Sequence, residues 1–386
     1  MKISRSLAGA VCAASILVSM NLLASPAASE RSEQSANQAS PAIAEYAEAA
    51  RQAAQEHDTP GFVMAFVSSK GVEEFVSHGV MDRVSRDPIS EDAQFQIASL
   101  SKIQTGIIVR NLVLEGRLDP QRAIVDYLPE DIDPAIVRNL GTATVAQLIS
   151  YRSGLPRDTS VLERKGNDPM LAPLTDTLLL RDLALAEMVA EPGEAYEYSN
   201  LGYALLGYVS ERAAGEPFDQ LHRKYVVDAF AMDRTMIELD KRARASLATP
   251  YRKEDASVAT SPWNTGRLAA ASGFYSTPRD IARLMTAQIS SYREGDNPAL
   301  HLTSAGLPVT ETRFYGYGLN RQSITLDGGT VDLYYHSGDM DGYAGFYTFV
   351  PGNDRGVVML TTRGGAGADR LRSLSIDYVL ARAPRS

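Results

Sequence analysis

The chain has few cysteines, few lysines and no long hydrophobic run in its main part. Its 386 residues include a single cysteine, Cys12, close to the N-terminus. A disulfide framework is therefore excluded, and the fold must be stabilised by a large hydrophobic core. Only seven residues are lysine, although lysine and arginine together number 38. Each lysine that stands in a chemical context therefore carries more weight than usual.

Sequence signatures of several functional classes are also missing. The formal net charge is −9 and there is no basic cluster, which argues against nucleic acid as a partner. Neither a G-x-S-x-G turn nor an H-E-x-x-H metal motif occurs, and the five histidines are scattered. The glycines at 316–318 and 364–367 lack the third glycine and the βαβ setting of a dinucleotide site. The sequence therefore predicts no cofactor and no metal.

The N-terminus is typical of a secretory signal. Lys2 and Arg5 precede a mostly apolar stretch from Leu7 to Ala24, and Ser25-Pro26-Ala27 supplies small residues for cleavage. Polar residues interrupt the apolar stretch, so we expect a signal peptide over 1–27 rather than a membrane anchor. No later segment is apolar enough to span a membrane. We expect a periplasmic or secreted protein without a stable membrane span after cleavage, in which residues 28–40 form a flexible linker.

The pattern of apolar residues changes twice along the chain. It predicts a helix over 41–56 and a hairpin with strands at 62–67 and 73–78, then mainly helices from 101 to about 232. Short β-prone runs and a closing helix follow, at 315–320, 331–336, 343–350, 356–361 and 369–381. We therefore predict an α/β fold over 41–386. Both ends of the chain, about 41–98 and 240–386, build its α/β part, and a mostly helical part of about 99–239 is inserted.

Nucleophilic chemistry is indicated first by the tetrad Ser99-Leu100-Ser101-Lys102. It places a hydroxyl and an amine three residues apart, where an apolar helical stretch begins. A serine hydroxyl is a poor nucleophile until a base takes its proton, and a partly desolvated lysine can do so. Chance alone gives roughly 0.6 such pairs in a chain with 34 serines and seven lysines. Ser101 is adjacent to Lys102 and does not share its helix face, so we interpret it as a scaffold hydroxyl.

Two further motifs follow the tetrad in order. Tyr198-Ser199-Asn200 precedes an apolar helix, and His336-Ser337-Gly338 ends a predicted strand and is followed by Asp339. Lys102 and Tyr198 can pass the proton of Ser99 to a leaving group, and Asn200 can bind the substrate or position Lys102. Gly338 allows a backbone to approach the substrate closely. The N–H groups of Ser99 and Asp339 can form an oxyanion hole.

Together the three motifs resemble those of the serine β-lactamase and penicillin-binding-protein superfamily. The order S-x-x-K, Y-x-N, H/K-x-G is similar to its branch of class C β-lactamases, DD-peptidases and family VIII carboxylesterases. The resemblance extends from about residue 42 to the C-terminus. Supporting segments lie at 147–155, 198–203 and 271–277.

The resemblance implies an antiparallel sheet flanked by helices, a helical domain and an active site in the cleft between them. It implies a covalent acyl-enzyme on Ser99, hydrolysed by water without metal or cofactor. Lys102 and Tyr198 would be the acid/base pair and Asn200 a polar positioning group. His336, Gly338 and Asp339 would contact the substrate or its transition state.

One position departs from the penicillin-hydrolysing pattern. Class C β-lactamases usually have lysine where this chain has His336, and that lysine supplies a positive charge for the carboxylate of the substrate. Histidine is mostly neutral near pH 7 unless its pKa is shifted. The position therefore favours ester or peptide/amide substrates over β-lactams.

We predict an exported serine hydrolase that acts on small-molecule carboxylic esters. The alternatives are a peptidase or amidase resembling DD-peptidases, a β-lactamase, and a non-catalytic binding protein on the same scaffold. Each site residue also has a structural interpretation: Ser99 as a helix N-cap, Tyr198 as a core aromatic and His336 as a satisfied strand-end histidine. The long polar stretch from Asp158 to Thr177 is expected to shape substrate choice. The sequence does not indicate an oligomeric state.

Overall fold

A single antiparallel sheet organises the part of the chain that the structure describes. The computed structural model describes residues 43–160, 172–302, 307–326 and 328–381. Within these residues the sheet has eight strands. Their order across the sheet is β2 (Gly71–Gly79), β1 (Gly61–Ser68), β10 (Arg355–Thr361), β9 (Tyr343–Val350), β8 (Gly329–Met340), β7 (Leu319–Leu326), β6 (Arg313–Gly316) and β5 (Leu307–Pro308). The predicted signal peptide and linker lie outside the described residues.

The central strands are buried on both faces. All residues of β1, β9 and β10 are buried, and their sequences are nearly continuous apolar runs. Such runs are typical of strands that are covered by other elements on both sides. The edge strand β2 is mostly accessible to solvent and carries charged residues, which protect its free edge from pairing with another chain.

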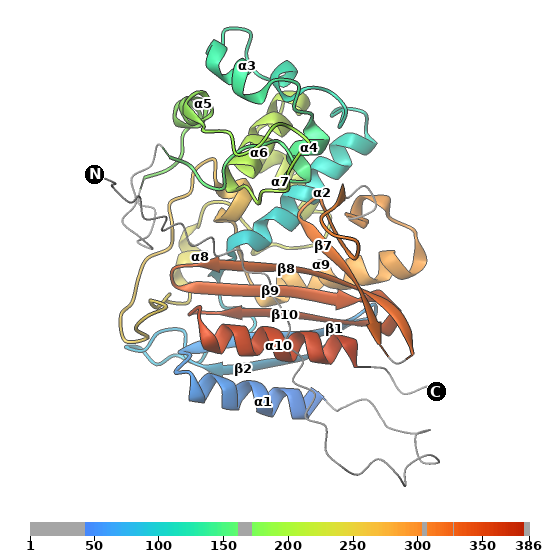
Figure 1. The fold of residues 1–386 in the computed structure, drawn as a ribbon. Helices are drawn as coiled ribbons and strands as arrows, with labels where there is room; N and C mark the ends of the chain where they lie inside the picture. Colours follow the sequence, from blue (N-terminus) through green and yellow to red (C-terminus); the bar gives the residue numbers. More distant parts are fainter. Residues whose placement is uncertain (1–42, 161–171, 303–306, 327, 382–386) are drawn as a thin grey trace, which may run out of the picture. The chain divides into compact units, whose positions relative to one another are not determined.

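Helices cover the two faces of the sheet. Helix α1 (Ile43–Glu56) packs against α10 (Ala366–Leu380), and α10 packs against β9 and β10 (Figure 1). Helix α9 (Pro278–Glu294) packs against β1 and β10 from the opposite face. Each face therefore has its own hydrophobic cluster. The predicted fold, an antiparallel sheet flanked by helices, is confirmed.

The remaining elements lie in the sequence between β2 and β5. They are β3 (Phe95–Gln96), η1 (Ala98–Leu100), α2 (Ser101–Leu114), η2 (Ile124–Tyr127), α3 (Pro134–Leu140), α4 (Val145–Ile149), α5 (Asp176–Leu185), α6 (Asn200–Ala214), α7 (Phe218–His222), η3 (Arg223–Val227), α8 (Lys241–Ala245), η4 (Ala269–Gly273), β4 (Tyr275–Ser276) and η5 (Pro298–Leu300). One further short helical segment, η6 (Pro351–Asn353), joins β9 to β10. Strands β3 and β4 pair with each other outside the main sheet.

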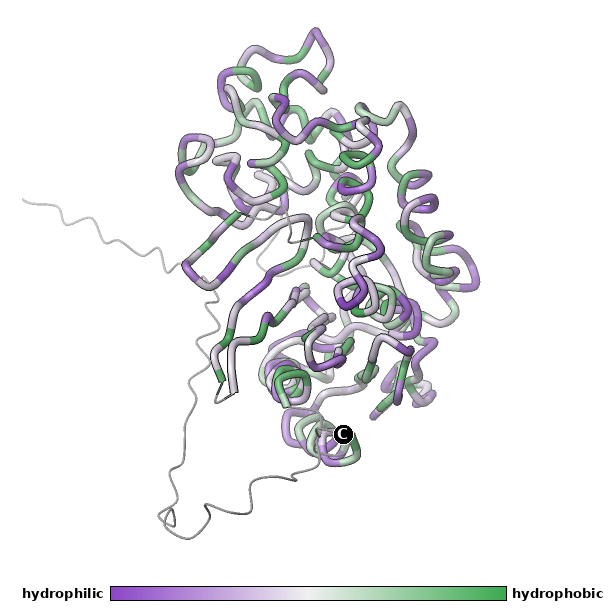
Figure 2. The backbone as a smooth tube through the Cα atoms, turned by 90° about the vertical axis from the view of Figure 1, so that its right-hand side faces the viewer, coloured by the Kyte–Doolittle hydropathy of each residue, from purple (hydrophilic) through white to green (hydrophobic). Residues whose placement is uncertain are grey.

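Helix α2 runs through the interior of this helical part. Ten of its 14 residues are buried, Lys102 among them, and it contacts α6, α7 and η4. In Figure 2, hydrophobic and hydrophilic residues are interleaved along the helices. Over the described residues, no helix is both long enough and apolar enough to cross a membrane.

The strand predicted at 315–320 is wrong, because the chain reverses direction within it. Tyr317 and Gly318 have φ of 48° and 81°, and they join β6 to β7 as a two-residue hairpin turn. Positive φ at both central residues is what such a turn requires, but Tyr-Gly is an uncommon choice for it. Tertiary packing supports the turn, since a Cβ at Gly106 of α2 would lie 1.7 Å from the Tyr317 carbonyl oxygen.

Other boundaries shift less. The strand predicted over 331–336 extends over Gly329–Met340, so the His336 motif lies within β8 and does not end it. Its last residues, from His336 to Met340, pair with β9 alone, and β8 there packs against η1. The closing helix begins at Ala366, three residues earlier than predicted. Of the loop predicted over 158–177, residues 161–171 lie outside the described residues, and Asp176 already begins α5.

Candidate active site

Ser99 lies in the single turn η1 that leads into α2. Its predecessor Ala98 has φ of 50°, a conformation that costs an L-residue about 1 kcal/mol or more. Helix α2 is capped at Leu100 without a side-chain hydrogen bond, so Ser99 is not its N-cap. The hydroxyl of Ser101 instead donates to the Ala98 carbonyl at 2.7 Å and accepts from Phe274 N–H at 3.1 Å. Ser101 thus supports the strained turn, in agreement with its expected scaffold role.

The amine of Lys102 is held by three groups. Its Nζ lies 3.1 Å from Ser99 Oγ, 2.7 Å from Asn200 Oδ1 and 2.7 Å from the Ala271 carbonyl oxygen. The side chain is fully buried, and this burial holds the pKa of Lys102 well below its usual value. A neutral amine donates its two hydrogens to the two carbonyl oxygens, which only accept. Its lone pair is then left for the proton of Ser99.

Tyr198 contacts Ser99 from the other side. Its hydroxyl donates to Ser99 Oγ at 2.8 Å, so it is not simply a core aromatic. Burial raises the pKa of Tyr198 above its ordinary value, which keeps the phenol protonated at neutral pH. The next residue, Ser199, is the N-cap of α6 and accepts a hydrogen bond from Gly202 N–H. This cap holds the backbone at the start of α6 and so fixes the position of Tyr198. Tyr198 is therefore placed as a hydrogen-bond donor beside the Ser99 hydroxyl.

His336 lies on β8, near the same tyrosine. Its ring centroid is 6.3 Å from those of Tyr198 and Tyr315, and only 3% of the residue is exposed. Burial lowers the pKa of His336 to about 3, with a smaller contribution from the charge of Lys102. Nδ1 lies 2.8 Å from the Ser337 carbonyl oxygen and must donate to it, so Nε2 is an acceptor. Nε2 is buried and has no hydrogen-bond partner among the described residues, so His336 is only half satisfied.

Gly338 brings the strand close to Ser99. A Cβ at this position would lie 3.1 Å from the Ser99 nitrogen and 2.8 Å from the Ile97 carbonyl oxygen. The side chain of Asp339 is bound elsewhere, since its Oδ1 accepts from Arg372 of α10 at 2.7 Å. Of the seven predicted site residues, Ser99, Lys102, Tyr198 and Asn200 are joined by direct hydrogen bonds. Gly338 packs against Ser99, His336 lies near Tyr198, and the side chain of Asp339 binds Arg372 of α10.

Comparison with known proteins agrees with this arrangement. A family model described as Beta-lactamase matches residues 46–380. The chain belongs to the beta-lactamase family. It is a hydrolase of the serine beta-lactamase and penicillin-binding-protein group, as the three motifs suggested.

Several relatives are distant in sequence but match most of the chain. A protein named Beta-lactamase from Providencia stuartii is 24% identical, over 80% of this chain and 84% of its own length. Penicillin-binding protein 4 of Amycolatopsis lactamdurans is 25% identical, over 85% and 88% of the two chains. A class C beta lactamase from Rhodobacter sphaeroides is similar in structure with a TM-score of 0.72 at 20% identity, covering 87% of this chain and 100% of the other.

Two residues of this beta-lactamase-family site were not singled out from the sequence. Asp158 accepts from Asn200 Nδ2 at 2.6 Å, and the guanidinium of Arg157 lies 4.8 Å from the centroid of the Tyr198 ring. Asp158 begins the long polar stretch that was expected to shape substrate choice, but no role was predicted for it, and Arg157 lies just before that stretch.

A set of tyrosines packs around Tyr198, and their arrangement was not predicted from the sequence. The hydroxyl of Tyr315 donates to that of Tyr151 at 2.7 Å, and the Tyr151 ring packs on Tyr198 at 4.7 Å between centroids. Tyr203 completes the set, with its ring centroid 5.6 Å from Lys102 Nζ. Tyr151 and Tyr203 were recognised only as part of the matching segments, because spacing along the chain does not indicate which rings meet.

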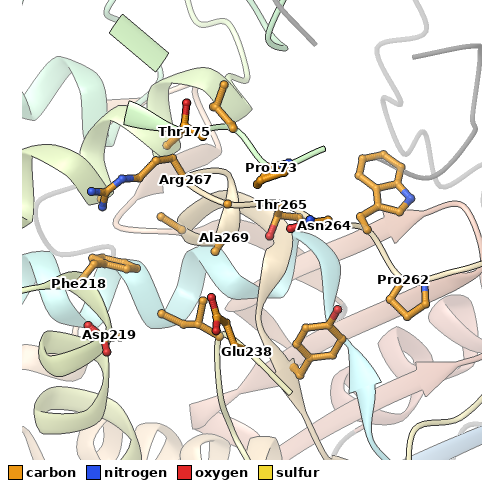
Figure 3. Close-up of a pocket in the computed structure, with 18 of the residues that line it drawn as sticks. Pro173, Thr175, Phe218, Asp219, Glu238, Pro262, Asn264, Thr265, Arg267 and Ala269 are labelled. Atoms are coloured by element: carbon orange, nitrogen blue, oxygen red, sulfur yellow. The ribbon is translucent and has the colours of Figure 1, made fainter. Parts of the chain in front are cut away.

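A cavity of about 1090 Å³ lies beside η4. Figure 3 shows Thr265, Asn264, Glu238 and Ala269 around it. None of the seven predicted site residues lines this cavity. Over the described residues, no group of three His, Cys, Asp or Glu side chains is placed to hold a metal ion.

Proposed function

We propose that this protein is an exported serine hydrolase that forms a covalent acyl-enzyme on Ser99 and acts on carboxylic esters. One observation carries the proposal: the Ser99 hydroxyl lies between the Lys102 amine at 3.1 Å and the Tyr198 hydroxyl at 2.8 Å. A nucleophile in contact with both a base and an acid has what acyl transfer requires.

The proposed reaction has two steps. Lys102 takes the proton of Ser99 as Oγ attacks the ester carbonyl, and the backbone N–H groups of Ser99 and Asp339 stabilise the oxyanion. Tyr198 protonates the departing alcohol and regains a proton from Lys102. Water then attacks the acyl-enzyme, loses a proton to the same pair, and Ser99 leaves with that proton. The products are the carboxylic acid and the alcohol.

The state of His336 supports an ester rather than a β-lactam as substrate. With a pKa of about 3, its ring is neutral near pH 7 and offers no fixed charge to a substrate carboxylate. Its Nε2, which has no partner among the described residues, can instead accept a hydrogen bond from a neutral substrate that carries a donor group.

An amide substrate is the alternative, and the names of relatives favour it. The relatives reported above include a protein named Beta-lactamase and one named Penicillin-binding protein 4. The alternatives within the enzyme class are therefore DD-peptidase-like action and β-lactam hydrolysis. A non-catalytic binding protein is disfavoured, because loss of function is expected to alter at least one of Ser99, Lys102, Tyr198 and His336.

Intact-mass measurement tests the acyl-enzyme. The purified protein is incubated separately with a fluorophosphonate and with a penicillin, and Ser99→Ala is the control. We expect a fluorophosphonate adduct that the variant lacks. An absence of adduct with both reagents would overturn the proposal that the protein is an enzyme.

A substrate panel then separates the alternatives. It consists of p-nitrophenyl esters of increasing acyl length, a chromogenic cephalosporin and peptides ending in D-Ala-D-Ala. Fastest turnover of the esters supports the proposal, whereas a clear preference for either amide class replaces it with that alternative.

Export is tested separately by expression with the full leader in a bacterial host and sequencing of the N-terminus. We expect an exported protein cleaved near Ala27.

A further inference from the structure

A chain of hydrogen bonds runs from the surface to the nucleophile. Asp158 Oδ1 accepts from Asn200 Nδ2 at 2.6 Å, and Asn200 Oδ1 accepts from Lys102 Nζ at 2.7 Å. Lys102 Nζ in turn lies 3.1 Å from Ser99 Oγ. Asp158 is the outermost member, with 49% of its side chain exposed, whereas Lys102 is fully buried.

Asp158 determines which way the Asn200 amide faces. An amide has a donor end and an acceptor end, and Lys102 needs the acceptor end to hold its amine. A carboxylate can only accept, so contact with Asp158 Oδ1 requires Nδ2 of Asn200 to face outward. The oxygen then faces Lys102. The backbone assists, because Asn200 N–H donates to the Arg157 carbonyl oxygen at 2.7 Å and holds α6 against the same dipeptide.

We propose that Asp158 is a positioning residue of the active site, which acts through Asn200 to hold the Lys102 amine on Ser99. The inference rests on the proposed function in one respect, that Lys102 is the base for Ser99. It goes beyond the three sequence motifs, since Asp158 belongs to none of them.

Charge gives the arrangement a second consequence. The negative charge of Asp158 raises the pKa of Lys102 against the larger lowering by burial, and the positive charge of Arg157 lowers it. The other titratable groups that face Lys102 are the rings of Tyr198 and Tyr203 and the neutral His336. Neighbouring residues 157 and 158 therefore act on the same amine with opposite sign.

The two charges shift the pH dependence of activity in opposite directions. Lys102 must be neutral to accept a proton, so activity rises with pH through the pKa of Lys102. Loss of the Asp158 charge lowers that pKa and moves the acidic limb of the pH profile to lower pH. Loss of the Arg157 charge raises that pKa and moves the acidic limb to higher pH.

Four variants test the proposal. Asp158→Ala removes both the hydrogen bond and the charge, and we expect about a 10- to 100-fold loss of kcat, as for loss of a hydrogen bond to a charged group. Asp158→Asn keeps an acceptor for Asn200 but not the charge, so we expect a smaller loss and a shift of the acidic limb to lower pH. Arg157→Gln should shift the limb to higher pH. Asp158→Glu should recover part of the activity that Asp158→Ala loses.

Ser160→Ala is the matched control. Ser160 donates its N–H and its hydroxyl to Asp182 Oδ1 at 3.0 and 2.7 Å, so it anchors the same loop without contacting Asn200. We expect this variant to keep the kcat and pH profile of the parent. An equal loss in Ser160→Ala and Asp158→Ala, with the acidic limb unmoved in all variants, would overturn the proposal.

A measurement without substrate separates this inference from the proposed function. The 13C chemical shift of the Lys102 side chain, followed against pH by NMR in the parent and in Asp158→Asn, reports the pKa of the amine directly. A lower pKa in the variant supports the inference even if no ester is turned over. An unchanged pKa contradicts it even if the protein is an active esterase.

Discussion

The chemistry proposed for the Ser99 hydroxyl depends on the burial of the two side chains that contact it, Lys102 and Tyr198. Lys102 and Tyr198 are ordinary titratable groups whose pKa values burial shifts in opposite directions, downward for the amine and upward for the phenol. Burial disfavours whichever form is charged, so the amine tends to lose its proton and the phenol to keep it. The same physical cause therefore suits Lys102 to its proposed role as base and Tyr198 to its proposed role as acid.

Removal of Ser99 and Lys102 tests whether they act as a unit. We expect Ser99→Ala and Lys102→Ala each to lower kcat by several orders of magnitude, because neither group can attack or activate alone. The double variant should be little worse than either single variant. Steady-state kinetics of the purified proteins, with folding checked by circular dichroism, measures this. Losses that add on a logarithmic scale would mean that Lys102 has only a structural role.

A lysine at position 336 tests the role of the neutral histidine. His336→Lys should raise kcat/KM for a carboxylate-bearing ester relative to its neutral amide or methyl-ester analogue, because it introduces a cation beside the site. The two substrates are compared in the parent and the variant, so a general loss of activity cancels in the ratio. An unchanged ratio would show that the substrate carboxylate does not face this position.

Strand β8 packs against the turn η1 that carries Ser99. The strand continues past β7, and the free part of its edge packs against the turn that carries Ser99. Glycine at 338 allows this contact, and the strained Ala98 lies directly beneath it, 3.1 Å from where a Cβ would be. The distance between the nucleophile and the proposed oxyanion donors is therefore set by the packing of a strand on a turn.

An added methyl group at Gly338 should disturb that packing. We expect Gly338→Ala to lower the free energy of unfolding by about 1–3 kcal/mol and to reduce kcat, because backbone atoms at 2.8–3.1 Å must move. Gly352→Ala is the control, since nothing lies within 4 Å of its Cβ position and it should change neither quantity. Urea unfolding measures the free energy of unfolding of each variant, and steady-state kinetics measures its kcat. Equal effects of the two substitutions would contradict this account.

Stability at acid pH is a property of the whole molecule. His222 of α7 is buried, with Nε2 2.7 Å from Gln104 Oε1, and burial lowers its pKa to about 3. In the unfolded chain the pKa of histidine is about 6.5, so the unfolded state binds more protons between these values. The contribution of buried, neutral His222 to the free energy of unfolding is therefore fully present above about pH 6.5 and is lost as the pH falls toward 3. His336 acts in the same direction.

Substitution of His222 should reduce this acid sensitivity. The parent should lose more unfolding free energy between pH 7 and pH 4.5 than His222→Gln, by about 2–3 kcal/mol. Urea midpoints of both proteins at the two pH values measure the difference, and any loss common to both pH values cancels. Equal losses in the two proteins would show that His222 is protonated in the native state as readily as in the unfolded one.

Several features were predictable from the sequence because they depend on local order. The tetrad at Ser99, the Tyr198 motif and the His336 motif are recognised by spacing, and the apolar runs of β1, β9 and β10 by composition. The turn at Tyr317-Gly318 was missed because packing against Gly106 of α2, and no turn signal, stabilises it. Asp158 was missed because nothing in its neighbours along the chain indicates Asn200, 42 residues away.

The fold class, the family and the set of side chains that we propose for acyl transfer could be predicted from the sequence, because they follow from patterns along the chain. Only the tertiary structure decided which groups meet: the orientation of the Asn200 amide, the neutral state of His336 and the direction of the Asp339 side chain toward α10. These depend on burial and on contacts between distant segments. A pKa or an amide orientation belongs to an environment, and an environment exists only in the folded chain.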